Sequence, residues 1–409
     1  MRLAVVSPFV DRRHGTERAL AELLERLVRD YHCRIHLYAQ RADDLPLVRS
    51  EKRASRGSGC IVWHKVPAIP GPHLVSFVAW VFANGFLRWW HRVFHRISFD
   101  LVVSPGINCF HADLMIVHVV FHRLSELARD STVGETPPSR FFRSLHRRAY
   151  YALLTQLERR VYSNRKTALA AVSQRTADQI NQYFRRSDVR VIPNGVDTRE
   201  FNISARIARR NPSRWRLGFR DTDFVLLLIG NDWRVKGVPA VVEAMAELRD
   251  LPLRLLVVGN DAPGPLRETA RRLGVLDRCT WEAPRPDVIE FYAAADSYVS
   301  PSLEDSFGLP VAEAMACGLP AITSARAGVS ALIHHSVDGF ILREPQDTQT
   351  LARMIERLYR DIPFRRSIGD AAARTAQRWT WDHSAAEAWA LLQEVAKRKG
   401  PHAVRDPTQ

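Results

Sequence analysis

Residues 301–320 read PSLEDSFGLPVAEAMACGLP and carry the most informative pattern in the chain. Two carboxylates, Asp305 and Glu313, lie eight residues apart, one in a loop and the other on the first turns of a helix that Pro310 can begin. Backbone N–H groups at residues 307–309 can bind phosphate oxygens, and carboxylates accept hydrogen bonds from sugar or ribose hydroxyls. An acid-rich helix start explains either carboxylate alone, but it does not explain the whole string.

Apolar runs of strand length alternate with amphipathic, helix-length segments along the chain, which is typical of an α/β protein with parallel sheets. Both halves hold about six strand candidates, so two doubly wound domains of similar size fit 409 residues better than one large sheet. The expected strands are 3–7, 34–39, 101–104, 114–118, 169–173, 189–193, 224–230, 253–259, 279–282, 297–300, 320–323 and 339–342. The expected helices are 17–29, 176–184, 238–248, 265–273, 287–295 and 309–316.

A turn signal marks the boundary between the two halves. Residues 192–197 read IPNGVD, and Pro followed by Asn-Gly breaks the strand pattern. The polar, Arg-rich residues 202–215 that follow are expected to form a surface connection. We therefore predict an N-terminal domain over 1–192, a C-terminal domain over 193–377 and a final segment over 378–409 that ends in a frayed tail.

The composition is strongly basic. There are 59 Lys and Arg against 44 Asp and Glu, a formal net charge of +15, which indicates an anionic partner such as nucleic acid, an acidic membrane face or a phosphorylated substrate. Residues 1–192 hold 30 basic and 16 acidic side chains, whereas residues 193–409 hold 29 and 28. The excess therefore lies in the first half and favours an anionic membrane or acceptor there. A non-catalytic, basic nucleic-acid-binding protein is the alternative of a different class, but no helix-turn-helix, zinc-finger or RNP-type motif supports it.

Cysteine usage and hydropathy narrow the class of protein further. The five Cys residues are scattered and form no C-x-x-C pair, so neither a disulfide framework nor a Cys zinc site is expected. This usage instead indicates a protein of a reducing compartment. The longest apolar stretch, within residues 73–87, is shorter than the roughly 20 residues that span a bilayer. The N-terminus reads as a first strand rather than a signal peptide. We predict a cytoplasmic protein, peripheral on the inner membrane.

Two loops supply further candidates for phosphate binding. After the first strand, Gly15 permits close backbone approach to a phosphate and Thr16 can cap the next helix, although a plain helix start explains both. Residues 230–237, GNDWRVKG, place Arg234 and Lys236 between a buried strand and a helix, an arrangement that suits a diphosphate. A solvated basic turn is the alternative, and it is weakened because Lys236 is one of only six lysines.

These stretches together resemble the family 4 retaining glycosyltransferases (glycosyl transferases group 1). Residues 301–320 are similar to the family's S-x-x-E-x-F-G-L-P-x-x-E-A-M-A-x-G-x-P string, and 230–237 to its G-R-x-x-x-x-K-G loop. Residues 192–197 resemble its interdomain segment, and 379–382, WTWD, the start of its C-terminal crossover helix. The matches run in family order along essentially the whole chain, and the subgroup it resembles most is the lipopolysaccharide-core glucosyltransferases.

The resemblance implies a GT-B fold, in which two Rossmann-like domains face each other across a cleft. The C-terminal domain would hold a nucleotide sugar, the N-terminal one would bind the acceptor, and 378–409 would cross back to the N-terminal domain. It further implies metal-independent transfer of a hexose, from a UDP-hexose, with retention of configuration, no cofactor and no protein nucleophile. The acceptor would be lipid-linked or of the lipopolysaccharide or exopolysaccharide type, at the cytoplasmic membrane face. A soluble small acceptor is the alternative, and the oligomeric state stays open.

The resemblance also assigns roles to single residues. Lys236 and Arg234 would neutralise the diphosphate, Asp305 would hold sugar hydroxyls, and Glu313 would accept a hydrogen bond from the ribose. His118 would face the donor sugar, with a buried or surface histidine as the alternative. With Lys236, Arg234, Asp305 and His118 as catalytic residues, the remaining donor-binding residues would be Gly15, Thr16, Asn231, Phe307, Gly308, Leu309 and Glu313.

The chain departs from the family pattern at three positions. Asp305 replaces the first Glu of the string, Asn231 stands where the family usually has Arg, and a single Gly15 after His14 replaces a Gly-Gly pair. The first two departures put the identity of the transferred sugar in doubt. None of them removes the diphosphate site.

Residues 73–99 mix bulky apolar side chains with arginines that recur every four residues, which places the arginines along one side of a helix. An amphipathic face with Trp and Arg at its edge suits the interface of an anionic bilayer. A helix buried against the first sheet, with a solvated Arg stripe, is the alternative. The residues expected on the membrane or acceptor side are Trp80, Arg88, Trp89, Trp90, Arg92 and Arg96.

Overall fold

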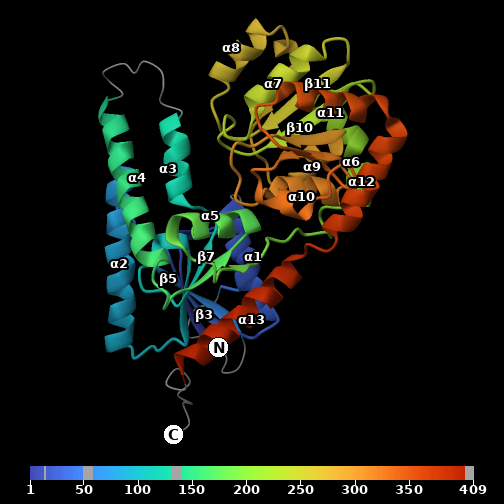
Figure 1. Ribbon diagram of the computed structural model, residues 1–409. Helices are drawn as coiled ribbons and strands as arrows, with labels where there is room; N and C mark the ends of the chain where they lie inside the picture. Colours follow the sequence, from blue (N-terminus) through green and yellow to red (C-terminus); the bar gives the residue numbers. More distant parts are fainter. Residues whose placement is uncertain (13–14, 49–58, 131–140, 401–409) are drawn as a thin grey trace. The chain divides into compact units, whose positions relative to one another are not determined.

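The computed structural model describes residues 1–12, 15–48, 59–130 and 141–400 and divides the chain into two compact units (Figure 1). Unit 1 consists of Met1–Pro193 and Asp382–Gln409, and unit 2 of Asn194–Trp381. The expected boundaries were after 192 and after 377. His14 and the expected tail at 401–409 lie outside the described residues. Each unit is described by itself.

Unit 1 is built on a seven-stranded sheet of parallel strands. The strand order reverses at β1, which lies between β3 and β6. The carboxyl ends of β1 and β6 therefore mark the edge at which ligands bind in open α/β sheets. In spatial order the strands are β5 (Cys60–Lys65), β3 (Arg34–Ala39), β1 (Arg2–Val6), β6 (Leu101–Pro105), β7 (Leu114–Val117), β8 (Ala168–Ala171) and β9 (Arg190–Val191). A short separate pair joins β2 (Phe9–Val10) to β4 (Arg41–Ala42).

Amphipathic helices connect and cover the strands of unit 1. The apolar residues of α1 that face the sheet, such as Leu20, Leu24 and Leu27, are buried. Helices α2 and α4 pack on each other along part of their length (Figure 1). The helices are α1 (Gly15–Arg29), α2 (His73–Phe94), α3 (Phe121–Asp130), α4 (Phe141–Tyr162), α5 (Gln174–Phe184), the 3-10 turn η2 (Gly106–Asn108) and α13 (Trp381–Lys399), which belongs to unit 1 from Asp382 on.

Unit 2 repeats this plan with a six-stranded parallel sheet. Its strand order reverses at β10, between β11 and β13. The strands in spatial order are β12 (Cys279–Glu282), β11 (Leu253–Val258), β10 (Phe224–Ile229), β13 (Ser297–Ser300), β14 (Ala321–Ser324) and β15 (Phe340–Leu342). The helices are α6 (Ile203–Arg216), α7 (Val238–Glu247), α8 (Gly264–Arg272), α9 (Ile289–Ala294), α10 (Leu309–Ala316), α11 (Thr348–Arg360) and α12 (Ile362–Ala376), with 3-10 turns η4 (Leu276–Arg278) and η5 (Gly328–Leu332).

The predicted class, two doubly wound α/β domains, is confirmed, and every expected strand overlaps an observed one. The edge strand β5 was not expected. The prediction of a surface connection over 202–215 was wrong, because these residues form α6, which Asn202 caps by accepting a hydrogen bond from the Ala205 N–H at 2.8 Å.

Arg214 shows why α6 belongs to the fold of unit 2. This arginine is buried, and its guanidinium donates to the carbonyl oxygens of Ala294 at 3.0 Å and Asp223 at 2.7 Å while pairing with Asp296 at 3.2 Å. It therefore joins α6 to the strands and to α9, a role that an Arg-rich composition does not reveal.

Replacing this buried guanidinium tests its role. Arg214→Met should lower the free energy of unfolding of unit 2 by about 3 kcal/mol, because buried carbonyl groups and a carboxylate lose their donor. The exposed Arg209 on the same helix is the matched control, and Arg209→Met should change stability by less than about 0.5 kcal/mol. Urea denaturation of the three proteins measures both values; equal effects of the two substitutions would contradict the structural role of Arg214.

Candidate functional site

The two predicted phosphate-binding loops of unit 2 meet at the switch point of its sheet. The loop after β10 and the loop after β13 follow neighbouring strands, and the Leu303 N–H donates to the Val235 carbonyl at 2.7 Å. Gly237, with φ +84°, permits this contact, because a Cβ there would lie 2.3 Å from the Pro301 carbonyl oxygen. The close approach of the two loops brings together side chains that are far apart in the sequence.

Lys236 and Asp305 form an ion pair across these loops. The Lys236 Nζ lies 2.5 Å from Asp305 Oδ2, and the two side chains are 21% and 14% exposed. The stem of Lys236 packs on Gly230, where an added Cβ would meet its Cε at 3.2 Å. The backbone of Asp305 is fixed by hydrogen bonds to residues 326–328. The structure therefore joins the cation and the carboxylate that the sequence assigned to separate motifs.

The N-terminus of α10 lies beside this ion pair. Gly308 begins the helix with φ +96°, and a Cβ at this position would lie 3.7 Å from Asp305 Oδ2. Among the described residues, none accepts a hydrogen bond from the backbone N–H groups of Phe307, Gly308 or Leu309. A helix N-terminus with free donors beside a lysine is suited to bind a phosphate or diphosphate.

Glu313, on α10, is positioned by a residue that the motifs did not reveal. Its Oε2 accepts a hydrogen bond from the Tyr292 hydroxyl on α9 at 2.6 Å, and both side chains are buried. Burial raises the pKa of Tyr292, and the neighbouring charge of Glu313 raises it further, so the hydroxyl stays protonated and donates. Only the distance in space, and no pattern of spacing, identifies Tyr292.

No hydrogen bond or ion pair joins the other predicted side chains of the β10 loop to Lys236 or Asp305 in the described part of the chain. Asn231 Oδ1 accepts a hydrogen bond from the Asn260 N–H at 2.9 Å, which ties this loop to the one after β11. Asp261, which no sequence pattern indicated, accepts a hydrogen bond from the Trp233 N–H at 2.6 Å and helps to hold the same turn. Arg234 is exposed, and no ion pair joins it to any residue within the described ranges. The donor-binding roles of Asn231 and Arg234 therefore remain predictions.

The candidates in unit 1 lie at the ligand-binding edge of its own sheet. Gly15 and Thr16 lie in the first turn of α1, which follows the carboxyl end of β1 in the sequence. His118 directly follows β7 and is buried, and this burial lowers its pKa to about 4. Its imidazole is therefore neutral near pH 7. Whether these three residues bind the donor stays a prediction.

A buried carboxylate organises the segment that follows His118. Glu158 of α4 accepts hydrogen bonds from the backbone N–H groups of Phe121 at 2.7 Å and His122 at 2.9 Å, and from His122 Nδ1 at 2.8 Å. Burial raises the pKa of Glu158 to about 7. Glu158 thus fixes the start of α3, a role that the sequence did not indicate.

Helix α2 presents a continuous apolar stripe to solvent. Phe82, the most exposed of these side chains, lies four residues from Phe86, and the stripe recurs at helical spacing. The exposed apolar residues are Val75, Val78, Phe82, Phe86, Trp89, Trp90, Val93 and Phe94, which we call the α2 apolar stripe. None of the described helices is long and apolar enough to cross a bilayer, and no group of three or more His, Cys, Asp or Glu in the described ranges could hold a metal ion.

Of the six residues predicted for the membrane side, Trp80 and Arg88 are not exposed, whereas the other four are: Trp89, Trp90, Arg92 and Arg96. Trp80 is buried, and its Nε1 donates to the Asn108 carbonyl at 3.1 Å, so its prediction as a membrane-side residue was wrong. Arg88 is half-buried and donates to Asn84 Oδ1 at 3.2 Å. Arg96 lies beyond the end of α2 with φ +51°.

Comparisons with known proteins agree with this architecture. Two family models match the chain, "Glycosyltransferase Family 4" over residues 13–200 and "Glycosyl transferases group 1" over residues 209–375, and together they cover most of it. A D-inositol 3-phosphate glycosyltransferase of Stackebrandtia nassauensis is 31% identical over 233 residues, which are 54% of this chain and 52% of that protein. The chain thus matches about half the length of this curated relative.

Two solved structures show the same fold over nearly the whole chain. WaaG, a glycosyltransferase involved in lipopolysaccharide biosynthesis, has a TM-score of 0.72 at 20% identity and covers 96% of this chain and 99% of its own. Anabaena Alr3699/HepE in complex with UDP-glucose has a TM-score of 0.68 at 19% identity, with coverage of 98% and 99%. At these identities the likeness concerns the fold, and it confirms the predicted GT-B architecture of two Rossmann-like domains.

The neutral state of His118 can be tested through pH. Because its pKa is lowered from 6.5 to about 4, the unfolded chain binds a proton that the native state excludes between these values, so this group makes stability fall as pH falls through that window. His118→Gln should reduce the loss of unfolding free energy between about pH 6.5 and 4 by up to about 3 kcal/mol. Urea denaturation of both proteins across this range measures it, and identical pH dependence would contradict a buried neutral His118.

Proposed function

The chain belongs to glycosyltransferase family 4, and we propose that it transfers a hexose from a nucleoside diphosphate sugar, a UDP-hexose, to an acceptor with retention of configuration. The observation that carries the proposal is the meeting of Lys236, Asp305 and the free N–H groups at the start of α10 at the switch point of the unit 2 sheet. This is the position at which a doubly wound sheet binds a nucleotide.

The chemistry follows from these groups. When the bond between the sugar and the diphosphate breaks, the sugar gains oxocarbenium character and the leaving phosphate gains negative charge. Lys236 and the N–H groups of residues 307–309 would stabilise that charge, because they are held in place before the reaction. Asp305 would hold Lys236 in position and accept hydrogen bonds from sugar hydroxyls, and Glu313, fixed by Tyr292, would accept from the ribose. The proposal requires no cofactor and no metal ion.

Three residues of unit 1 belong to the same proposal. Gly15 and Thr16, at the start of α1, are proposed to bind a phosphate, since they lie at the ligand-binding edge of their sheet. His118, neutral because of its burial, is proposed to face the donor sugar as a hydrogen-bonding group.

A nucleotide screen and a substitution test the donor site. Of UDP, GDP and ADP, UDP should raise the melting temperature most, and Lys236→Ala should abolish the shift and lower kcat/KM with the matching nucleotide sugar by about 10²- to 10³-fold. Arg271→Ala is the control, because Arg271 is an exposed cation of unit 2 that pairs only with its helix neighbour Glu268 in the described structure. Turnover of Lys236→Ala at the rate of the control would refute the assignment.

A lipid-linked or lipopolysaccharide-type acceptor at an anionic membrane is the acceptor that we favour. The α2 apolar stripe is supported by exposed Arg92 at its C-terminal end, and the net positive charge of the chain resides in residues 1–192. Apolar side chains beside cations are suited to the interface of an anionic bilayer. The protein would then act as a peripheral protein at the cytoplasmic membrane face.

A soluble phosphorylated polyol is the second candidate acceptor. The observation in its favour is the 31% identity to a protein described as D-inositol 3-phosphate glycosyltransferase. On this alternative, the positive charge of residues 1–192 would attract a small anionic acceptor rather than a membrane.

Liposome flotation separates the two candidates. The protein should float with vesicles that contain anionic phospholipid and much less with neutral ones, and Phe82→Asp combined with Phe86→Asp should reduce flotation at least about tenfold, since charges on the stripe oppose insertion. Trp215→Asp is the control, because Trp215 is a strongly exposed aromatic residue of unit 2. If the floated fraction is the same with anionic and neutral vesicles and is unchanged by the substitutions in the α2 apolar stripe, the membrane acceptor is contradicted and the soluble one is favoured.

A further inference from the structure

The chain passes between the two units twice, and the two connections are bonded to each other. On the unit 1 side, Ser384 Oγ donates to the Pro193 carbonyl at 2.5 Å. On the unit 2 side, the Val196 N–H donates to the Trp379 carbonyl at 2.7 Å. Gly195 allows this pairing, because a Cβ there would lie 2.2 Å from the Trp381 backbone nitrogen. The two connections therefore form one two-stranded strip, which is joined by one of these hydrogen bonds in each unit.

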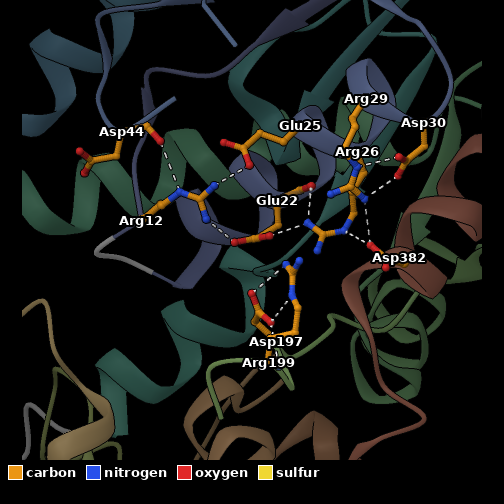
Figure 2. Close-up of polar contacts among 10 residues, drawn as sticks. All are labelled: Arg12, Glu22, Glu25, Arg26, Arg29, Asp30, Asp44, Asp197, Arg199 and Asp382. Atoms are coloured by element: carbon orange, nitrogen blue, oxygen red, sulfur yellow. Dashed lines mark hydrogen bonds and ion pairs between the residues drawn. The ribbon is translucent and has the colours of Figure 1, made fainter. Parts of the chain in front are cut away.

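Asp382, the first residue of unit 1 after the second connection, is held by α1. Its Oδ1 accepts from Arg26 Nε at 2.6 Å and from Arg29 at 3.3 Å (Figure 2). The Arg26 guanidinium is buried although it is charged, whereas the Asp382 side chain is 68% exposed. Asp382 thus fastens the end of the strip to a charge in the interior of unit 1.

The ion pairs continue from Arg26 through Glu22 to Arg12, two residues after β2. The Arg26 guanidinium pairs with Glu22 Oε2 at 2.5 Å, and the other oxygen of Glu22 accepts a hydrogen bond from Arg12 (Figure 2). Arg12 also pairs with Glu25 at 2.6 Å. Charged groups therefore alternate in sign from Asp382 to Arg12, which stands three residues before Gly15 in the sequence.

Asp382, Arg26, Glu22 and Arg12 form one ion-pair network, and the burial of its two central side chains makes them depend on their charged partners. Glu22 lies between two guanidinium groups, and Arg26 lies between two carboxylates, with both side chains almost fully withdrawn from solvent. Loss of one charge in such a setting leaves its buried neighbour with one charged partner instead of two, which favours a rearrangement of the remaining groups. Glu22 and Arg26 thus link Asp382 to Arg12 through three successive ion pairs, although Asp382 and Arg12 do not touch in the described structure.

We infer that the ion-pair network Asp382–Arg26–Glu22–Arg12 couples the strip between the units to the segment Phe9–Arg12, and that its members are positioning residues for donor binding. The role in donor binding rests on the proposed function, in which Gly15 and Thr16 bind a phosphate. The coupling itself rests only on the ion pairs. None of the four residues needs to touch the substrate.

Hydrogen exchange tests the coupling without reference to activity. Asp382→Asn keeps the size of the side chain but removes one of the two negative charges that pair with Arg26, so the backbone amides of Phe9–Arg12 should exchange at least about threefold faster than in the unsubstituted protein. Asp382→Glu should restore slow exchange. Glu394→Gln is the control, because Glu394 lies on the same helix but pairs with Arg190, which is not part of the ion-pair network. Unchanged exchange at Phe9–Arg12 in Asp382→Asn would overturn the coupling.

Kinetics test the positioning role. Asp382→Asn and Arg12→Gln should each raise KM for the nucleotide sugar about five- to tenfold with kcat within about twofold, and the double variant should be no worse than the worse single one, since both act through one chain. Additive effects, or wild-type KM values in a variant with accelerated exchange, would overturn the positioning role. If the unsubstituted protein transfers no sugar, the proposed function fails, and the exchange measurement still decides the coupling.

Discussion

The ion pair between Lys236 and Asp305 is the interaction on which the account of the site depends. It forms because β10 and β13 are neighbours at the point where the strand order of unit 2 reverses, so the loops that follow them meet. Gly237 allows the loops to approach, and Gly308 begins α10 beside the carboxylate. Each of these features serves to hold one cation and a row of backbone N–H groups where a diphosphate can bind.

The sequence predicted the members of the site better than their contacts. Lys236, Asp305 and Glu313 stand out in the sequence because they are charged residues beside glycines and helix starts that follow apolar strands. The resemblance to a known family then assigns each of them a role. The pairing of Lys236 with Asp305 spans 69 residues and depends on strand order, which no local pattern contains. Tyr292 was missed for a related reason: it looks like an ordinary core aromatic residue until its hydroxyl is seen to meet Glu313.

For the fold as well, the elements that local sequence patterns determine were predicted, and the features that depend on distant contacts were not. Buried parallel strands read as continuous apolar runs, so the expected strands of both sheets were found. Helix α6 was mistaken for a connection because its arginines look solvated, whereas Arg214 is buried and donates hydrogen bonds to the carbonyl oxygens of Ala294 and Asp223. Trp80 was assigned to the membrane side because one helix face cannot be told from another by composition; in the structure it packs inward, while Phe82 and Phe86 face solvent.

Lys236 and the start of α10 are proposed to form the site for the donor diphosphate. A crystal structure of the protein with UDP is the decisive experiment. We expect a phosphate oxygen within about 3 Å of Lys236 Nζ and other phosphate oxygens that accept hydrogen bonds from the N–H groups of residues 307–309. A well-ordered nucleotide bound elsewhere, with Lys236 making no phosphate contact, would contradict it.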